Sequence, residues 1–128
     1  MIENSRKLGE MNYDGLFAGL TPAAQTGKVT LRALDTAATL ARGTLLGVSS
    51  EDGKCVVYGT DAADGETLTP TAVLCDDTEV GDSDVIAVAY TAGLFNSNKI
   101  VVAEDYDLTA ADLDMLRQYD IILKACAV

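Results

Sequence analysis

The sequence of 128 residues contains no histidine and no tryptophan, and only three cysteines and two prolines. Histidine is the usual base that activates a serine or cysteine nucleophile, and it is a common zinc ligand. Its absence excludes Ser-His-Asp and Cys-His arrangements and the common zinc sites. The cysteines, Cys55, Cys75 and Cys126, form no CxxC pair, and their odd number does not indicate a disulfide framework. Because Cys55 and Cys75 lie in apolar runs, we expect them to be buried as small hydrophobic residues.

Long apolar runs are missing too. No uninterrupted run approaches the roughly 18 residues that cross a bilayer, although 48 % of the residues are hydrophobic. No apolar stretch follows the basic residues near the start, so we expect no secretory signal. The length suits one ordinary domain with a core of its own. We therefore predict a soluble domain with no membrane partner.

Charge is unevenly distributed along the chain. The formal net charge is −11, with +1 in residues 1–42 and −12 in residues 43–128. An acidic body repels phosphate backbones, and no basic patch with interleaved aromatic residues is present. The sequence therefore predicts no nucleic-acid partner.

Three segments could carry chemistry, and each has a simpler explanation. Residues 76–84 hold five carboxylates, but the glycine stands at the wrong position for an EF-hand loop and no glutamate follows at the twelfth. Residues 104–107 precede a predicted helix, whose N-terminus their charges suit. Residues 43–47 lack a phosphate-binding pattern, so their glycines favour turns or bulges. We predict no catalytic residue, no metal and no cofactor; an enzyme would depend on Cys55 or on the carboxylates of 76–84.

The N-terminal part differs from the body. Residues 1–39 are interrupted by glycines and show no clear helical or strand period, except in the alternating stretch KVTLRAL at 28–34. We predict an N-terminal arm in residues 1–39 and a β-rich domain in residues 40–128. The arm either frays or adds a strand to the domain's own sheet, or it orders on a partner by strand addition and buries apolar side chains there. The residues assigned to that partner contact are Tyr13, Leu16, Phe17, Leu20, Pro22, Val29 and Leu31.

The body is predicted to be mainly β with one short C-terminal helix. Apolar runs at 44–50 and 54–58 flank Glu51-Asp52-Gly53, which predicts a hairpin because glycine accepts a positive φ. Further strands are predicted at 71–77 and 84–91, joined by an acidic turn, and at 99–103.

A helix is predicted over residues 108–119, followed by a final strand. Thr109 is a suitable N-cap, and Asp112 complements the first turn. Asp120 is placed to end the helix, because aspartate tolerates the left-handed conformation.

The order of these elements resembles the lambda-type bacteriophage head decoration proteins over residues 15–123. The similar stretches are LARGTLLG (40–47), the DGK turn with VVY, DGETLTPTAVLCDD, DSDVIAVAYTAGLFN and LDMLRQYDIIL. The residues that carry the resemblance are Arg42, Gly43, Thr44, Gly47, Asp64, Gly65, Pro70, Asn96, Leu116, Arg117 and Ile121. The chain departs from the family in having Asp120 before the closing Ile121, SNKIVVAEDYDLTA before the last helix, and 13 additional residues before DGLFAGLTPA.

The resemblance implies a compact β-clip-like domain with an extended N-terminal arm, forming homotrimers on the outer capsid surface of the virion after assembly in the host cytoplasm. Such proteins bind quasi-threefold sites of the expanded head and stabilise it against packaged DNA. Their arms add a strand to the major capsid protein. An alternative is a virion-surface adhesion or glycan-binding module, which a shallow pocket lined by Tyr58 and Tyr90 would support.

Overall fold

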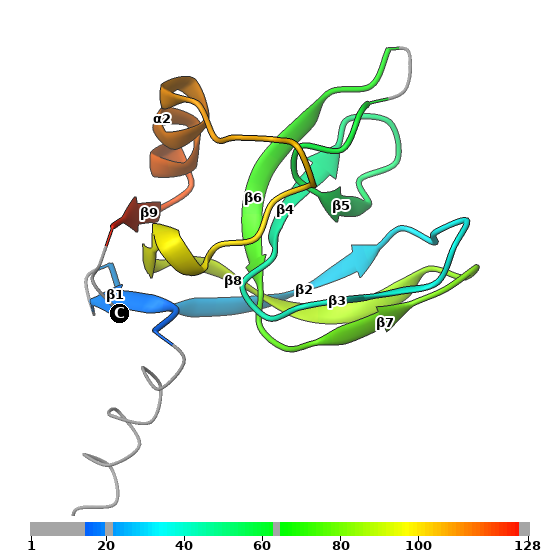
Figure 1. The fold of residues 1–128 in the computed structure, drawn as a ribbon, viewed down its shortest axis with the longest axis horizontal. Helices are drawn as coiled ribbons and strands as arrows, with labels where there is room; N and C mark the ends of the chain where they lie inside the picture. Colours follow the sequence, from blue (N-terminus) through cyan, green and yellow to red (C-terminus); the bar gives the residue numbers. More distant parts are fainter. Residues whose placement is uncertain (1–14, 20–21, 63–64, 126–128) are drawn as a thin grey trace, which may run out of the picture.

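The computed structural model describes residues 15–19, 22–62 and 65–125. Figure 1 shows strands throughout and one α-helix near the C-terminus, which confirms the predicted fold class. The elements are β1 (Phe17–Gly19), β2 (Gln25–Leu31), β3 (Ala38–Leu40), β4 (Leu45–Ser49), β5 (Cys55–Val57), β6 (Leu68–Leu74), β7 (Thr78–Val80), β8 (Val85–Asn96), η1 (Ser97–Lys99), α2 (Ala110–Gln118) and β9 (Ile121–Lys124).

Five strands close into a ring in the order β2, β5, β4, β6, β8. The ring closes because β8 pairs with both β2 and β6. The seam between β2 and β5 is parallel and short, with Leu31 opposite Cys55. The ring is filled by a first core of Leu31, Leu46, Cys55, Ala72, Leu74, Val80, Ala87 and Ala89. Cys55 and Cys75 are both buried, as the sequence predicted.

The long strand β8 extends beyond the ring and organises a second core. Its C-terminal half lies between β1, which is antiparallel to it, and β9, which is parallel. In Figure 1, α2 and β9 lie on the same side of the molecule as β1, away from the β3–β7 sheet. The second core contains Leu16, Phe17, Leu45, Tyr58, Val73, Phe95, Leu116 and Ile121.

Several local predictions are confirmed. β4 and β5 form the expected antiparallel hairpin, and Gly53 in its turn has a φ of 72°. Thr109 is the N-cap of α2, and its side chain and that of Asp112 form a capping box. Asp120 follows the helix with a φ of 61°, as expected for a residue that ends it in the left-handed region.

Two local predictions were wrong in part. The segment between β6 and β8 is not a simple turn, because β7 pairs there with β3. Residues 99–103 do not form a strand: η1 occupies their start, and Val101 makes only an isolated bridge to Thr44. From Leu46 onward β4 is paired on both edges, with β5 and with β6, so the 99–103 segment can pair only at the beginning of β4.

The N-terminal strands lie in the sheets of the body. β2 pairs with β8 along its whole length, and β1 pairs with the other half of the same strand. For these strands the structure shows the first interpretation, a strand of the domain's own sheet. A domain boundary at residue 39 stays a prediction.

Candidate capsid interface

Leu16 and Phe17, near the start of the described residues, lie in the second core. The backbone N–H of Asn96 donates a hydrogen bond of 2.6 Å to the carbonyl of Leu16, and Phe17 stands opposite Phe95 in the β1–β8 pair. Leu16 is 2 % exposed and Phe17 is 7 % exposed. Leu16 and Phe17 are therefore anchored in the second core, and we call these two residues the arm root.

Aromatic rings and one arginine surround the arm root. The Phe17 ring lies 5.0 Å from the ring of Phe95 and 5.0 Å from that of Tyr90, measured between centroids. The Arg42 guanidinium lies 5.4 Å from the centroid of Tyr90 and 6.0 Å from that of Phe17, within range of a cation–π interaction. It also donates hydrogen bonds of 2.7 Å to the Tyr90 hydroxyl and 2.8 Å to the Cys75 carbonyl. Arg42 thus ties β1 to β6 and β8.

The residues next to Arg42 shape the same region. Gly43 has a φ of 93°, and a Cβ there would stand 2.9 Å from the carbonyl oxygen of Lys99, so no other residue fits without a shift. Thr44 is buried, and its hydroxyl donates a hydrogen bond of 2.6 Å to the carbonyl of Ala41. Asn96 is fully buried, and its side chain accepts from the backbone N–H of Asn98 at 3.0 Å.

The remaining motif residues are more dispersed. Leu116 and Ile121 are fully buried in the second core. Gly47 and Pro70 face each other across β4 and β6, where the register shifts at a bulge. Gly65 has a φ of 79°, Arg117 is exposed with its guanidinium 3.8 Å from Asp114, and Asp64 lies outside the described residues. The structure therefore gathers most of the family-motif residues around the second core.

The predicted arm residues are divided between the two cores. Leu16 and Phe17 belong to the second core and Leu31 to the first, where Val29 packs against it. Pro22 is partly buried, and Tyr13 and Leu20 lie outside the described residues. Their contact with the capsid stays a prediction, and for the three buried residues it would require them to leave their cores.

A polar network around Asp112, in the first turn of α2, was not predicted from the sequence. Asp112 accepts hydrogen bonds from the Tyr58 hydroxyl at 2.5 Å, from the Tyr106 hydroxyl and from the backbone N–H of Thr109 at 2.9 Å. Burial acts to raise the pKa of Asp112, but the hydrogen bonds from Thr109, Tyr106 and Tyr58 outweigh it and hold that pKa below its usual value. Burial and the bond to Asp112 raise the pKa of Tyr58. The capping-box signal was readable in the sequence, whereas the two tyrosine partners were not.

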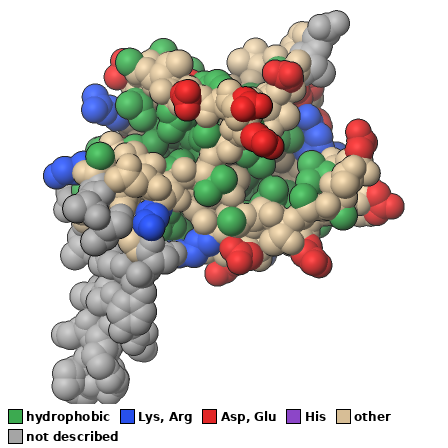
Figure 2. Space-filling model, viewed as in Figure 1, with side chains coloured by type: hydrophobic (Ala, Val, Ile, Leu, Met, Phe, Trp, Pro, Cys, Tyr) green, Lys and Arg blue, Asp and Glu red, His purple; other side chains and the backbone are tan. Residues whose placement is uncertain are grey.

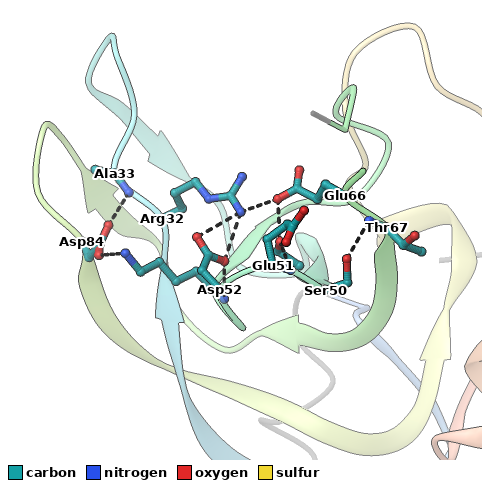
Figure 3. Close-up of polar contacts among 10 residues, drawn as sticks. Arg32, Ala33, Ser50, Glu51, Asp52, Glu66, Thr67 and Asp84 are labelled. Atoms are coloured by element: carbon teal, nitrogen blue, oxygen red, sulfur yellow. Dashed lines mark hydrogen bonds and ion pairs between the residues drawn. The ribbon is translucent and has the colours of Figure 1, made fainter. Parts of the chain in front are cut away.

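A second polar cluster holds the opposite end of the ring (Figure 3). Arg32, which follows β2, lies 3.1 Å from Asp52 in the β4–β5 turn and 2.6 Å from Glu66 ahead of β6. Hydrogen bonds to Glu66 and Asp52 raise the pKa of Arg32. We call Arg32, Asp52 and Glu66 the seam cluster, because it joins both sides of the parallel β2–β5 seam.

A neighbouring ion pair joins the same hairpin to the start of β8. Lys54 lies 2.5 Å from Asp84, which also accepts from the backbone N–H of Ala33 at 2.8 Å. The hydrogen bond from Lys54 lowers the pKa of Asp84. In the same acidic stretch, Asp77 accepts from the backbone N–H of Arg42. Asp77 and Asp84 therefore bind backbone N–H groups and a lysine of the same chain.

Within the described ranges, no three or more acidic or cysteine side chains are grouped so that they could hold a metal ion. The same part of the chain has no helix with the length and apolar character needed to cross a bilayer.

These observations define a class of protein: a small, mainly β domain in which most of the family-motif residues lie around the second core. The family model of the bacteriophage lambda head decoration protein D matches residues 7–121. The chain belongs to this family, as the resemblance predicted. No curated protein matches it. Membership makes the chain a structural capsid decoration protein, associated with the phage capsid and located in the virion.

Proposed function

We propose that the protein binds as a homotrimer at quasi-threefold sites of the expanded head and stabilises the shell against the pressure of packaged DNA. Its partners are the major capsid protein and further copies of itself, and no nucleic acid takes part. The observation that carries the proposal is the family match over residues 7–121. The buried arm root supports it, because a rigid body can then transmit a contact made by residues that precede Leu16.

Multivalency supplies the strength of binding in this proposal. A strand of about five ladder hydrogen bonds, at roughly 0.5 to 1.5 kcal/mol net each, binds weakly once the entropy of ordering is subtracted. Three such strands on one trimer raise avidity by about two to four orders of magnitude. A trimer that binds the expanded shell and not its precursor stabilises the expanded state by mass action.

The glycan-binding alternative gains no support from the tyrosines on which it depended. Tyr58 is 8 % exposed, and its hydroxyl is bonded to Asp112. Tyr90 packs against Phe17 and accepts a hydrogen bond from Arg42. The hollow that Tyr58 lines, of about 410 Å³, has Tyr106 as its other aromatic residue and does not include Tyr90.

Cosedimentation with purified shells tests the proposal. We expect the full chain to sediment with expanded, undecorated heads and not with unexpanded procapsids. A chain that lacks residues 1–14 is the sharpest variant, because a deletion reaching residue 26 would also remove β1, Leu16 and Phe17 from the second core. We expect this variant to remain folded and to lose most of its binding. Failure of the full chain to bind expanded heads would contradict the proposal.

A further inference from the structure

The outer face of the ring carries an apolar strip that nothing in the described chain covers. Ile86 is 72 % exposed and Val88 is 46 % exposed, although their neighbours Ala87 and Ala89 point into the first core. Both strip residues lie on β8, and their cross-strand partners on β2 are Thr30 and Lys28. Ile86 and Val88 together form a small apolar surface, and contact with another molecule that removes it from water would be favourable.

The strip lies far from the arm root. Ile86 and Phe95 stand near opposite ends of β8, and at about 3.3 Å per residue the strand can separate them by up to roughly 30 Å. Phe95 packs against Phe17 at the arm root. If the N-terminal residues contact the shell, the strip lies to one side of that contact, which favours a neighbouring decoration protein over the shell.

A groove elsewhere on the molecule is also lined mainly by apolar side chains and carries one acidic residue. It has a volume of about 530 Å³ and is lined by Leu40, Val57, Val101 and Val102, with Glu104 as its charged residue. Val101 is 45 % exposed. Figure 2 shows hydrophobic side chains exposed among aspartates and glutamates on one face of the molecule.

The charges beside the two surfaces are complementary. Lys28 next to the strip makes no ion pair with any described residue, and the same holds for Glu104 at the groove. Because each copy carries a net charge of −11, copies repel one another, and a pair of opposite charges at the contact offsets part of that repulsion. Lys28 against Glu104 provides this, and the apolar strip provides the contact area.

We propose that Ile86 and Val88 of one copy dock in the Leu40–Val101 groove of the next, with Lys28 facing Glu104. This inference rests on the proposed trimer and names its contact surfaces. Because strip and groove are different parts of the chain, the contact is head-to-tail, and three such contacts close a ring.

Sedimentation velocity on the purified full chain tests the apolar part. We expect Ile86→Asp and Val101→Asp each to abolish trimer formation, measured in solution if the free wild type is trimeric there and otherwise as the loss of threefold clusters on expanded, undecorated heads. Tyr119→Asp is the matched control, since Tyr119 is also 45 % exposed but lies beyond α2. Far-ultraviolet circular dichroism verifies that all three variants are folded. A trimer that survives both strip and groove substitutions overturns the contact.

A charge exchange tests the pairing. Lys28→Glu and Glu104→Lys should each weaken trimer formation by about tenfold, and the double variant should restore it. Lys99→Glu and Asp35→Lys are the matched controls and should leave assembly unchanged. Single variants without effect, or a double variant that is no better than the singles, would overturn the proposed pair. A wild-type chain that is trimeric neither in solution nor on expanded heads overturns the trimer itself and this contact with it, whereas a trimer that all the variants still form overturns the contact alone.

Discussion

Tyr58 donates a hydrogen bond of 2.5 Å to Asp112, a residue 54 positions further along the chain. Asp112 is also the third residue of α2, where it closes the capping box with Thr109. The same carboxylate accepts from Tyr106. One buried side chain therefore joins the end of β5, the connection that precedes α2 and the helix itself.

Replacing Asp112 with alanine should destabilise the fold by about 2 to 4 kcal/mol, because it removes a helix cap and leaves two tyrosine hydroxyls without their acceptor. Urea denaturation followed by circular dichroism measures the loss. Asp114→Ala is the control, since Asp114 lies on the exposed side of the same helix and should change stability by less than about 0.5 kcal/mol. Equal effects of the two substitutions would show that the network contributes nothing beyond helix propensity.

Asp112 should also make stability depend on acidic pH. Its folded-state pKa is lower than usual, so the ionised carboxylate favours the folded state. This contribution is complete above the unfolded pKa of about 4 and is lost as the pH falls through the lower folded pKa. The pKa values of Asp52 and Asp84 are lowered too. Protonation of these two carboxylates at acidic pH therefore also destabilises the wild type. We expect Asp112→Asn to flatten, but not abolish, the fall in unfolding free energy between about pH 5 and pH 2; an unchanged slope would contradict this role.

The arm root predicts different outcomes for two changes at the N-terminus. Phe17→Ala should cost about 3 to 5 kcal/mol, because it removes a buried ring that stacks on Phe95 and faces Arg42. Deleting residues 1–14 should cost little, because it leaves Leu16 and Phe17 in place in the second core. Thermal denaturation compares the two proteins. A large destabilisation by the deletion would mean that residues ahead of the arm root belong to the fold.

Much of the body could be predicted from local signals in the sequence. The Asp-Gly turn at Gly53 needs a positive φ, and the Thr109 cap with Asp112 is a local code, so the hairpin and the helix were both predicted correctly. The fate of the N-terminal segment could not be decided locally. Its alternating stretch could pair with a strand of an external partner or with the domain's own sheet. The pairing of β2 with β8 shows that the second of these holds.

The run at residues 99–103 shows a second limit. Its β-branched composition favours a strand, but a strand also needs a free edge of the sheet to pair with. Both edges of β4 are already paired with β5 and β6, so only the bridge between Thr44 and Val101 forms. The seam cluster was missed for a related reason. Arg32, Asp52 and Glu66 come from three separate segments, and no spacing in the sequence brings them together.

The seam cluster predicts a salt-dependent contribution to stability. Arg32→Gln should destabilise the protein by about 1 to 3 kcal/mol, because Arg32 bridges Asp52 and the largely buried Glu66 where β2 and β5 share only one register pair. Urea denaturation at low salt and in 1 M NaCl measures the effect, and the difference from wild type should shrink at high salt. Arg117→Gln is the control, since that arginine pairs with Asp114 on the surface. A difference that is the same at both salt concentrations would show that the cluster acts through packing and not through charge.

The two buried cysteines report separately on the two ends of the ring. Burial raises the pKa values of the Cys55 and Cys75 thiols, so in a Cys126→Ser background both should react with iodoacetamide at least about a hundredfold more slowly in the native state than in urea. Cys75 offers its carbonyl to Arg42 near the arm root, whereas Cys55 lies at the parallel seam. Phe17→Ala should therefore accelerate alkylation of Cys75 more than that of Cys55, and Arg32→Gln should do the reverse, as peptide mass spectrometry would show. Equal acceleration of both thiols by each variant would mean that the ring opens as one unit and that the arm root and the seam cluster do not stabilise separate regions.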